Sequence, residues 1–266
     1  MPKDTGFDRQ AIARDWLPRY TGMPLDKFGD YILLTNFNGY VDRFAAKFDA
    51  EIFGQGKPMQ ACSNDFGVTI INFGIGSANA ATIMDLLSAK MPEAVLFLGK
   101  CGGLKQSSEI GHFILPIAAI RGEGTSNDYV PKEVPALPSF KLHKFVSEHI
   151  CGRGMDYRTG VVYTTNRRLW EHDNDFRQKL CDMACIGIDM ETAKIFIVGH
   201  FNQISRGALL LVSDVPITPD GVKTQHSDQH VTKNWVDLHL DIGIEAMMEI
   251  GSKGEQIRHF RFDQNE

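Results

Sequence analysis

Residues 208–212, an unbroken apolar run that ends in Ser213 and Asp214, constrain the fold most strongly. A strand with apolar side chains on both faces is buried between two layers, as in the parallel sheets of α/β proteins. The acid-containing turn Gly-Ile-Asp-Met-Glu, which ends at Glu191, precedes this strand in the chain. Because ligands bind at the carboxyl ends of strands in open α/β sheets, we predict that Asp214 and Glu191 belong to one site.

Other apolar segments predict an alternation of strands and helices. A predicted helix at residues 78–90 lies between two strands and makes a βαβ unit. Residues 231–250 predict one long closing helix with Trp235, Leu238 and Ile242 on one face. Strands are predicted at residues 31–36, 68–73, 94–99, 112–120, 159–164 and 208–212.

Composition limits the class of protein. With 266 residues, of which 43% are hydrophobic and 23% charged, the chain is long enough for one large α/β domain. We predict a helical N-terminal appendage at residues 1–28, with a helix at 7–20, and a single catalytic domain at residues 29–266. The net charge of −5 disfavours a nucleic-acid partner. Without a long apolar stretch or a signal core, a cytoplasmic protein with no membrane partner is expected.

Two carboxyl groups in this setting suit cleavage of a bond between a sugar and a nitrogen leaving group. The transition state resembles an oxocarbenium ion, and the departing base needs a proton. Partial burial would keep Asp214 protonated so that it supplies this proton, while Glu191 would stay ionised and accept hydrogen bonds from sugar hydroxyls. The alternative is structural: Asp214 caps a turn before Pro216, and Glu191 is favoured by a helix dipole.

Four motifs, in order along the chain, carry a resemblance to a known family. The pair Met190 and Glu191 and the strand end at Asp214 resemble the purine nucleoside phosphorylase and nucleosidase superfamily. Three further segments resemble the AMP nucleosidase branch of this superfamily. They are residues 98–104 (LGKCGGL) with 110–116 (IGHFILP), residues 164–170 (TTNRRLW) and residues 213–224 (SDVPITPDGVKT). The resemblance runs from about Tyr31 to the C-terminal helix. It implies a three-layer α/β/α fold with a central mixed, partly barrel-like sheet.

The resemblance also implies an activity and roles for particular residues. The expected enzyme is an N-glycosyl hydrolase that converts AMP to adenine and ribose 5-phosphate without a cofactor, and it forms a homo-oligomer, often a hexamer. Asp214 would protonate the purine, Glu191 and Met190 would hold the ribose, and Tyr163 would stack on the base. A purine nucleoside phosphorylase acting on adenosine or inosine is the first alternative. A non-catalytic sensor of adenine nucleotides is the second.

The expected phosphate ligands follow the family only in part. Gly39 and Arg43 have the four-residue spacing of the glycine and arginine that hold phosphate in the hexameric bacterial phosphorylases. Phe97 and Lys100 stand where those phosphorylases carry an arginine and a serine, which argues against phosphorolysis. The methylthioadenosine nucleosidases carry a glutamate base at the place of Arg43, and this chain lacks it.

Several cations are candidates for the 5′-phosphate of the nucleotide. Lys100 lies at the central glycine turn. The resemblance places the loops that contain Arg121 and Lys223 near the site. Asn166, Arg167 and Arg168 follow Tyr163 in another loop. Arginine can bind phosphate through two nitrogens and lysine as a point charge, so the residue types do not choose among these candidates.

Glycine turns are predicted at residues 38–39, 74–77 and 99–103, where backbone amides can approach an anion. Residues 74–79 lack the last glycine of the dinucleotide-binding pattern, which disfavours a nicotinamide-dependent enzyme. The loop at residues 121–139 is the longest irregular segment, and loops of this length are often functional.

We predict reduced cysteines and no metal. The five cysteines have no metal-ligand spacing, and Cys101 has no base near it in the sequence that would make it a nucleophile. His226 and His230 are of metal-ligating type, but their spacing before a helix is not that of a known site. A polar cap is the expected role of this segment.

Overall fold

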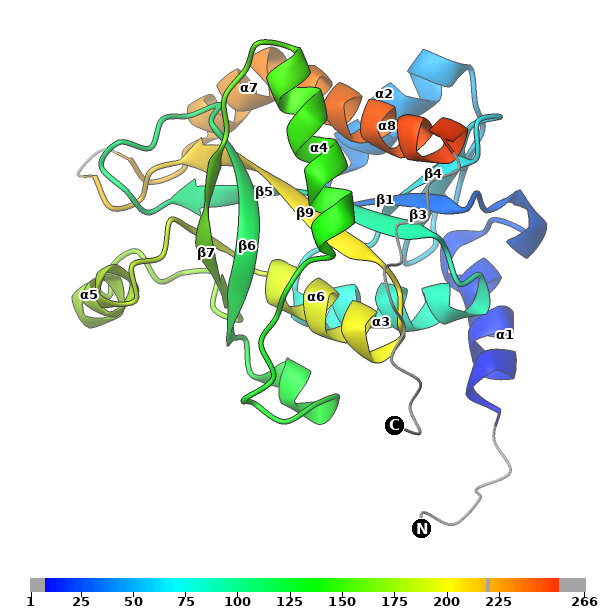
Figure 1. Ribbon diagram of the computed structural model, residues 1–266, viewed down its shortest axis with the longest axis horizontal. Coiled ribbons are helices and arrows are strands. Elements are labelled where there is room, and N and C mark those ends of the chain that lie inside the picture. Colours follow the sequence, from blue (N-terminus) through cyan, green and yellow to red (C-terminus); the bar gives the residue numbers. More distant parts are fainter. Residues whose placement is uncertain (1–7, 219–220, 254–266) are drawn as a thin grey trace.

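The computed structural model describes residues 8–218 and 221–253 and is drawn in Figure 1. Its strands are β1 (Tyr31–Thr35), β2 (Ile52–Phe53), β3 (Gln60–Ser63), β4 (Val68–Asn72), β5 (Ala94–Gly103), β6 (Phe113–Gly122), β7 (Arg158–Thr165), β8 (Gly187–Asp189) and β9 (Arg206–Asp214). Its helices are α1 (Arg9–Thr21), α2 (Asn38–Phe48), α3 (Ser77–Leu86), α4 (Phe140–Gly152), α5 (Asn174–Asp182), α6 (Thr192–Phe201), α7 (Gln225–Asn234) and α8 (Val236–Lys253), with 3-10 turns η1 (Leu25–Lys27), η2 (Leu87–Ala89) and η3 (Thr125–Asp128).

The strands form one mixed sheet that partly closes on itself. Their order is β2-β3-β4-β1-β5-β8-β7-β6-β9, and β9 also pairs with β5. Strands β5 to β9 therefore form a partial barrel. The parallel pairing of β5 and β9 sets Lys100 opposite Leu211, and a register shift after Cys101 sets Gly102 opposite Asp214. The carboxyl ends of these two strands consequently lie at one edge of the sheet.

Helices cover the sheet on both faces (Figure 1). Helices α1, α3 and α6 lie on one side, and α2, α4 and α8 lie on the other. The side chains of β9 alternate between the two cores: Leu210 and Val212 pack in the first, and Leu209 and Leu211 pack in the second. This two-sided burial is the physical reason for the unbroken apolar run. The predicted three-layer α/β/α fold with a partly barrel-like sheet is confirmed.

The predicted N-terminal helix is present as α1. Asp8 caps its start by accepting a hydrogen bond from the backbone of Gln10, and Gly22 ends it with a left-handed φ of 70°. Leu17 is fully buried in the core that α1 shares with α3. The helix thus packs outside the sheet, as expected, whereas the division into an appendage and a catalytic domain stays a prediction. Phe7 lies outside the described residues.

The predicted elements differ from the structure in the closing helix and in the short strands. The predicted closing helix at residues 231–250 is wrong as a single helix, because α7 and α8 meet at Trp235. The ring of Trp235 packs directly on Gly111, where any Cβ would lie 2.3 Å from it. Strands β2, β3 and β8 were not predicted, since each is too short to carry a periodic signal.

Among the described residues, none of the helices has both the length and the apolar character that crossing a membrane requires.

Candidate active site

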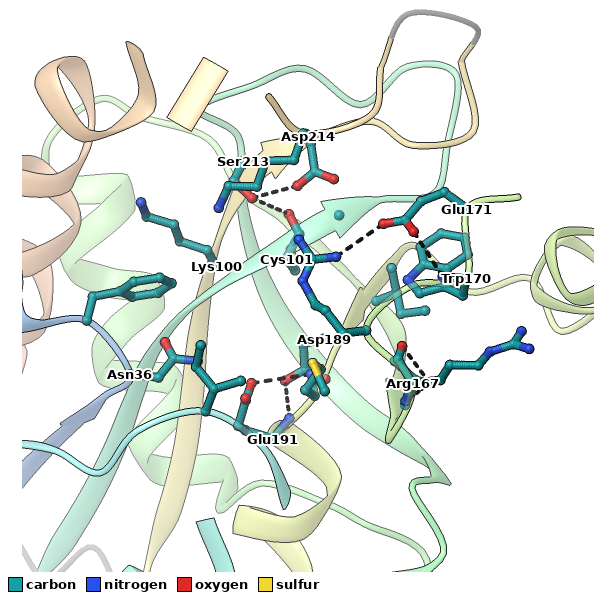
Figure 2. Close-up of a pocket in the computed structure, with 18 residues that line it drawn as sticks. Asn36, Lys100, Cys101, Arg167, Trp170, Glu171, Asp189, Glu191, Ser213 and Asp214 are labelled. Carbon is teal, nitrogen blue, oxygen red and sulfur yellow. Dashed lines mark hydrogen bonds and ion pairs between the residues drawn. The ribbon is translucent and has the colours of Figure 1, made fainter. Parts of the chain in front are cut away.

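A cavity of about 230 Å³ opens at the carboxyl ends of the central strands (Figure 2). Side chains from the ends of β1, β5, β8 and β9 and from the loop after β7 line it. Asp214, Glu191 and Met190, which the sequence assigns to one site, all line this cavity. The topology explains their convergence, because β9 runs parallel to β5 and ends beside Gly102, while β8 pairs antiparallel with Gly102 and Gly103 at the same end of β5.

Asp214 is the last residue of β9 and is only 9% exposed. Its Oδ1 accepts a hydrogen bond from Ser213 Oγ at 2.7 Å. Burial raises the pKa of Asp214, and the Ser213 hydrogen bond and the charges of Lys223 and Arg168 oppose this rise. The direction of the pKa shift favours a protonated carboxyl group, which is the form that a general acid requires.

Glu191 precedes α6 and is 2% exposed. Gly76 N donates to its Oε1 at 2.8 Å, and Met190 N donates to its Oε2 at 3.3 Å. Gly76 has a φ of 99°, a conformation that favours glycine. The amides at the start of α3, which the sequence predicts to approach an anion, therefore hold the carboxyl group of Glu191.

A second carboxyl group, that of Asp189, lies beside Glu191 and was not singled out from the sequence. Asp189 accepts hydrogen bonds from Thr164 Oγ1 at 2.7 Å, from Thr192 N at 2.7 Å and from Glu191 N at 3.2 Å. Burial and the charge of Asp189 raise the pKa of Glu191, against the backbone hydrogen bonds of Gly76 and Met190. This direction is opposite to the ionised Glu191 expected from the sequence.

The other two predicted glycine turns differ from each other, because residues 99–103 do not begin a helix whereas residues 38–39 begin α2. Residues 99–103 belong to β5, where the glycines permit close packing: a Cβ at Gly102 would lie 3.0 Å from Pro216, and one at Gly103 would lie 2.7 Å from Ser108. At the start of α2, the carbonyl of Gly39 accepts a hydrogen bond from Arg43 Nη1 at 3.0 Å.

Tyr163 does not line the main cavity. Its ring packs on Gly122 and makes an edge contact with Phe176, with 5.6 Å between the ring centroids. Strand β7 explains this placement, because Thr164 reaches Asp189 and the neighbouring Tyr163 must then face the opposite side. Tyr163 lines a neighbouring cavity, which shares Thr165 and Arg167 with the main one, and its contact with the base stays a prediction.

Trp170 lines the cavity instead, in the TTNRRLW segment that follows β7. Its backbone N–H donates to Glu171 Oε2 at 2.9 Å, and Glu171 Oε1 pairs with Arg168 Nη1 at 3.2 Å. Arg167 also lines the cavity, and its Nη2 pairs with Asp173 Oδ2 at 2.8 Å. The motif was visible in the sequence, but the direction of its aromatic side chain was not.

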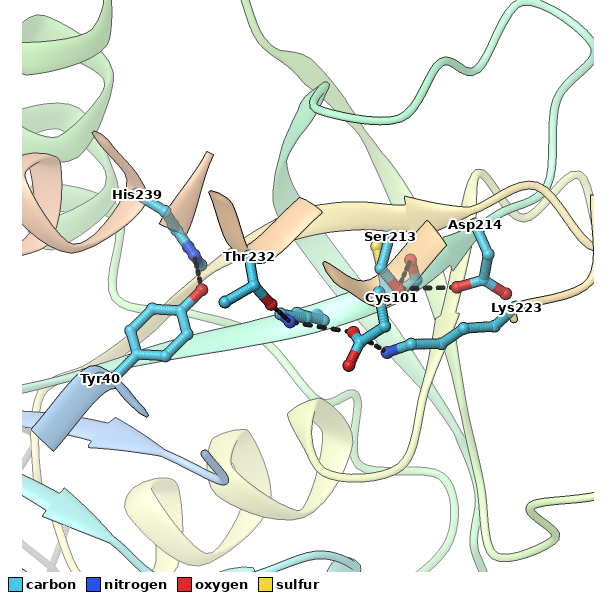
Figure 3. A network of polar contacts seen from close by, with 9 residues as sticks. Tyr40, Cys101, Ser213, Asp214, Lys223, Thr232 and His239 are labelled. Atoms are coloured by element: carbon cyan, nitrogen blue, oxygen red, sulfur yellow. Dashed lines mark hydrogen bonds and ion pairs between the residues drawn. The ribbon is translucent and has the colours of Figure 1, made fainter. Parts of the chain in front are cut away.

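Lys100 and Lys223 lie on another wall of the cavity. Lys100 Nζ is 3.1 Å and Lys223 Nζ is 2.8 Å from the same oxygen, Oδ1 of Asp228 in α7. Figure 3 labels Lys223 and Thr232, which belong to this polar network. Lys100 Nζ also donates to Thr232 Oγ1 at 3.3 Å and lies 4.6 Å from the ring centroid of Phe37. Burial lowers the pKa of Lys100, whereas Asp228 raises it.

Gly39 and Arg43 line an adjoining cavity, which shares Lys100 with the main one. Arg43 Nε pairs with Asp237 Oδ1 at 2.6 Å, so its charge is already partly neutralised. Asp228 also lines this second cavity.

Arg121 lines neither of these two cavities, and its role as a phosphate ligand stays a prediction. It supports the loop at residues 121–139 from within. Its guanidinium group donates to Ser126 Oγ, to Asn127 Oδ1 and to the carbonyl oxygens of Val130, Pro131 and Val134. A guanidinium group held in this way stabilises its own loop.

Cys101 is buried beside the carboxyl groups, and burial together with the charges of Asp189 and Asp214 raises its thiol pKa well above the ordinary value. A neutral thiol of this kind is a poor nucleophile. All five cysteines are free, as predicted. Over residues 8–218 and 221–253, no three His, Cys, Asp or Glu side chains converge as metal ligands. The side chain of His226 lies outside the described residues, while His230 is near Asn234 in α7.

Comparison with known proteins gives a consistent family match. The profile of the phosphorylase superfamily matches residues 31–245. The AMP nucleosidase of Escherichia coli (strain K12) is 28% identical over 296 aligned positions, which cover 93% of this chain. This chain spans 60% of the length of that relative.

Solved structures show the same likeness. The crystal structure of AMP nucleosidase from Bacteroides thetaiotaomicron VPI-5482 superimposes with a TM-score of 0.83 and 50% sequence identity, covering 94% of this chain and 100% of that one. Purine nucleoside phosphorylase from Toxoplasma gondii, in complex with immucillin-H, has a TM-score of 0.77 at 15% identity, over 87% of this chain and 95% of that one. The second likeness is one of fold alone.

Proposed function

The chain belongs to the phosphorylase superfamily, and we propose that it hydrolyses the N-glycosidic bond of AMP to adenine and ribose 5-phosphate. The observation that carries this proposal is the pair of buried carboxyl groups, Asp214 and Glu191, that line one cavity at the strand ends. Likeness at 50% identity to a solved AMP nucleosidase over its full length supports the choice of substrate.

In the proposed reaction, Asp214 acts as the general acid. The bond between the ribose carbon C1′ and the purine nitrogen breaks, and its electron pair leaves with the base. Asp214 donates its proton to a ring nitrogen of the purine, so that adenine departs as a neutral molecule. A water oxygen then bonds to the oxocarbenium-like carbon, and the proton that the water loses restores the carboxyl group. A raised pKa, set by burial, keeps Asp214 ready for this role.

The remaining contacts of the substrate follow from the walls of the cavity. Glu191 and Met190 hold the ribose hydroxyls, with the Glu191 carboxyl group oriented by the amides of Gly76 and Met190. Trp170 gives the purine an aromatic contact, the role that the sequence assigns to Tyr163. Lys100 and Lys223 are the cations of the cavity wall that bind the 5′-phosphate.

The test is adenine release from AMP and from adenosine, each with and without inorganic phosphate, with the sugar product identified. We expect ribose 5-phosphate from AMP without added phosphate. Ribose 1-phosphate from adenosine, formed only when phosphate is present, would overturn the proposal in favour of a phosphorylase. Binding of AMP without release of adenine would instead indicate a nucleotide sensor.

We further propose a cytoplasmic homohexamer, in which residues 29–266 form the catalytic domain and residues 1–28 an appendage. Exposed apolar side chains support association: Phe140 is 82%, Ile117 57% and Leu137 41% exposed, and all three line one groove. Light scattering coupled to gel filtration measures the mass in solution. A monomer at micromolar concentration would contradict the oligomer, and fractionation of cells tests the compartment.

A further inference from the structure

Two lysine ammonium groups converge on a single carboxylate oxygen at the wall of the cavity. Lys100 Nζ and Lys223 Nζ approach Asp228 Oδ1 at 3.1 Å and 2.8 Å. A phosphate oxygen accepts charge-assisted hydrogen bonds from ammonium groups at the same distances. The carboxylate of Asp228 therefore stands where an oxygen of a bound phosphate group would be held.

Lys100 and Asp228 differ in the solvent exposure of their side chains. The side chain of Lys100 is 5% exposed, and that of Asp228 is 43% exposed. A buried ammonium group needs an anion beside it, because leaving it unpaired is costly. The Asp228 carboxylate, in contrast, loses little when it moves into solvent. Lys100 is thus the fixed part of the cluster and Lys223, at 21% exposure, lies beside it, whereas the carboxylate is the exchangeable part.

The lysines serve the same cavity as the proposed catalytic groups. Lys100 and Lys223 line the cavity that contains Asp214 and Glu191, whereas Asp228 lines only the adjoining one. Displacement of Asp228 would therefore open the two ammonium groups toward the substrate. We propose that Lys100 and Lys223 form the site of the substrate's 5′-phosphate, and that Asp228 is a built-in competitor which the phosphate must displace.

This inference rests on the proposed function, because it assigns a phosphate-bearing substrate to the cavity. The apparent affinity for such a ligand is reduced by the fraction of molecules in which Asp228 holds the lysines. An unphosphorylated nucleoside has no group that replaces the carboxylate, so it gains nothing from the exchange. Asp228 consequently sets the affinity for the phosphate group and leaves the affinity for the nucleoside part unchanged.

The test compares Asp228→Asn with Asp241→Asn. Asp241 pairs with Lys47 at 2.5 Å and lines neither cavity, so it controls for the loss of a helix carboxylate. Titration calorimetry with inorganic phosphate is expected to show an affinity gain on the order of tenfold for Asp228→Asn and none for the control. The KM for AMP should fall in parallel, whereas the dissociation constant for adenosine should not change.

A double variant identifies the groups involved. Lys223→Gln should weaken phosphate binding. Asp228→Asn should raise the affinity for phosphate less in the Lys223→Gln background than in the wild-type background. Unchanged or weaker phosphate binding by Asp228→Asn would overturn the inference, because it would mean that Asp228 orients the lysines and does not compete with the ligand. The calorimetric result does not depend on turnover. If Asp228→Asn binds phosphate more tightly but no variant cleaves AMP, the proposed function fails and the competition stands.

Discussion

The two ends of the cavity hold a carboxyl group in different ways. At the Asp214 end, one rotatable hydroxyl group, that of Ser213, donates to the carboxyl oxygen. At the Glu191 end, the backbone amides of Gly76 and Met190 hold both oxygens, and the carboxyl group of Asp189 lies alongside. Both ends are buried, and burial raises both pKa values.

Burial alone therefore does not assign a role to either carboxyl group. A hydroxyl group can rotate as the proton leaves and returns, so the Asp214 end suits proton transfer. Backbone amides are fixed by α3 and by the turn before α6, so the Glu191 end suits a ligand whose geometry has to be constant. A proton donor and a fixed ligand should therefore respond differently to substitution.

The largest expected effect is at the proton donor. Asp214→Asn retains the shape of the side chain and removes its acidic proton, so kcat for AMP should fall by about 10²–10⁴-fold. The dissociation constant for AMP should change little, because the lost interaction acts mainly in the transition state. Rapid-quench assays measure kcat, and calorimetry measures binding. Turnover near the wild-type rate would remove Asp214 from the mechanism.

A smaller effect is expected at the fixed ligand. Glu191→Gln should lower kcat/KM for AMP by about 2–10-fold, the size of a lost hydrogen bond between neutral groups, because the raised pKa keeps the Glu191 carboxyl group protonated. The substrate itself supplies the control: 2′-deoxy-AMP lacks one hydroxyl group that Glu191 would hold. The variant should discriminate between AMP and 2′-deoxy-AMP less than the wild type does. Equal discrimination by both proteins would mean that Glu191 does not contact that hydroxyl group.

The wild type and Glu191→Gln should also differ in how their stability depends on pH. The pKa of Glu191 is raised above its ordinary value of 4.5 by burial and by Asp189. As the pH rises above this value, the unfolded chain loses its proton first and the folded chain retains it, so stability falls until the folded pKa is reached. Between about pH 5 and pH 8, Tm of the wild type should fall by several degrees more than Tm of Glu191→Gln. Parallel Tm curves would contradict the raised pKa.

Sequence alone predicted the part of the site that depends on strand ends. The apolar run before Asp214 identified a buried strand, and the rule that ligands bind at strand ends predicted one site for Asp214 and Glu191. The two residues do line one cavity, but the antiparallel pairing of β8 with β5 that brings Glu191 there was not predicted. Asp228 could not be predicted, because its contact with Lys100 joins residues 128 positions apart in the chain. Asp189 lies on a strand of three residues, which is too short for a periodic pattern.

Side-chain direction was the other limit of the sequence. Arg121 has the charge expected of a phosphate ligand, yet the loop that follows it supplies five acceptors for its guanidinium group. Whether a loop carbonyl or a ligand receives such a hydrogen bond depends on the folded path of the loop, which residue types do not specify. The side chain of Thr164 reaches Asp189, and that of its neighbour Tyr163 points to the opposite face of β7.

The smallest effect is expected at Tyr163, whose side chain points away from the main cavity. Tyr163→Phe keeps the ring that packs on Gly122 and against Phe176, so kcat and KM for AMP should change by less than about twofold. Trp170→Phe, which reduces an aromatic surface that lines the cavity, should raise KM several-fold, on the order of the energy of one aromatic contact. Steady-state kinetics of both variants under the same conditions measure this difference. If Tyr163→Phe raised KM as much as Trp170→Phe, the base would contact Tyr163 after all, and the cavity would have to rearrange around β7 when the nucleotide binds.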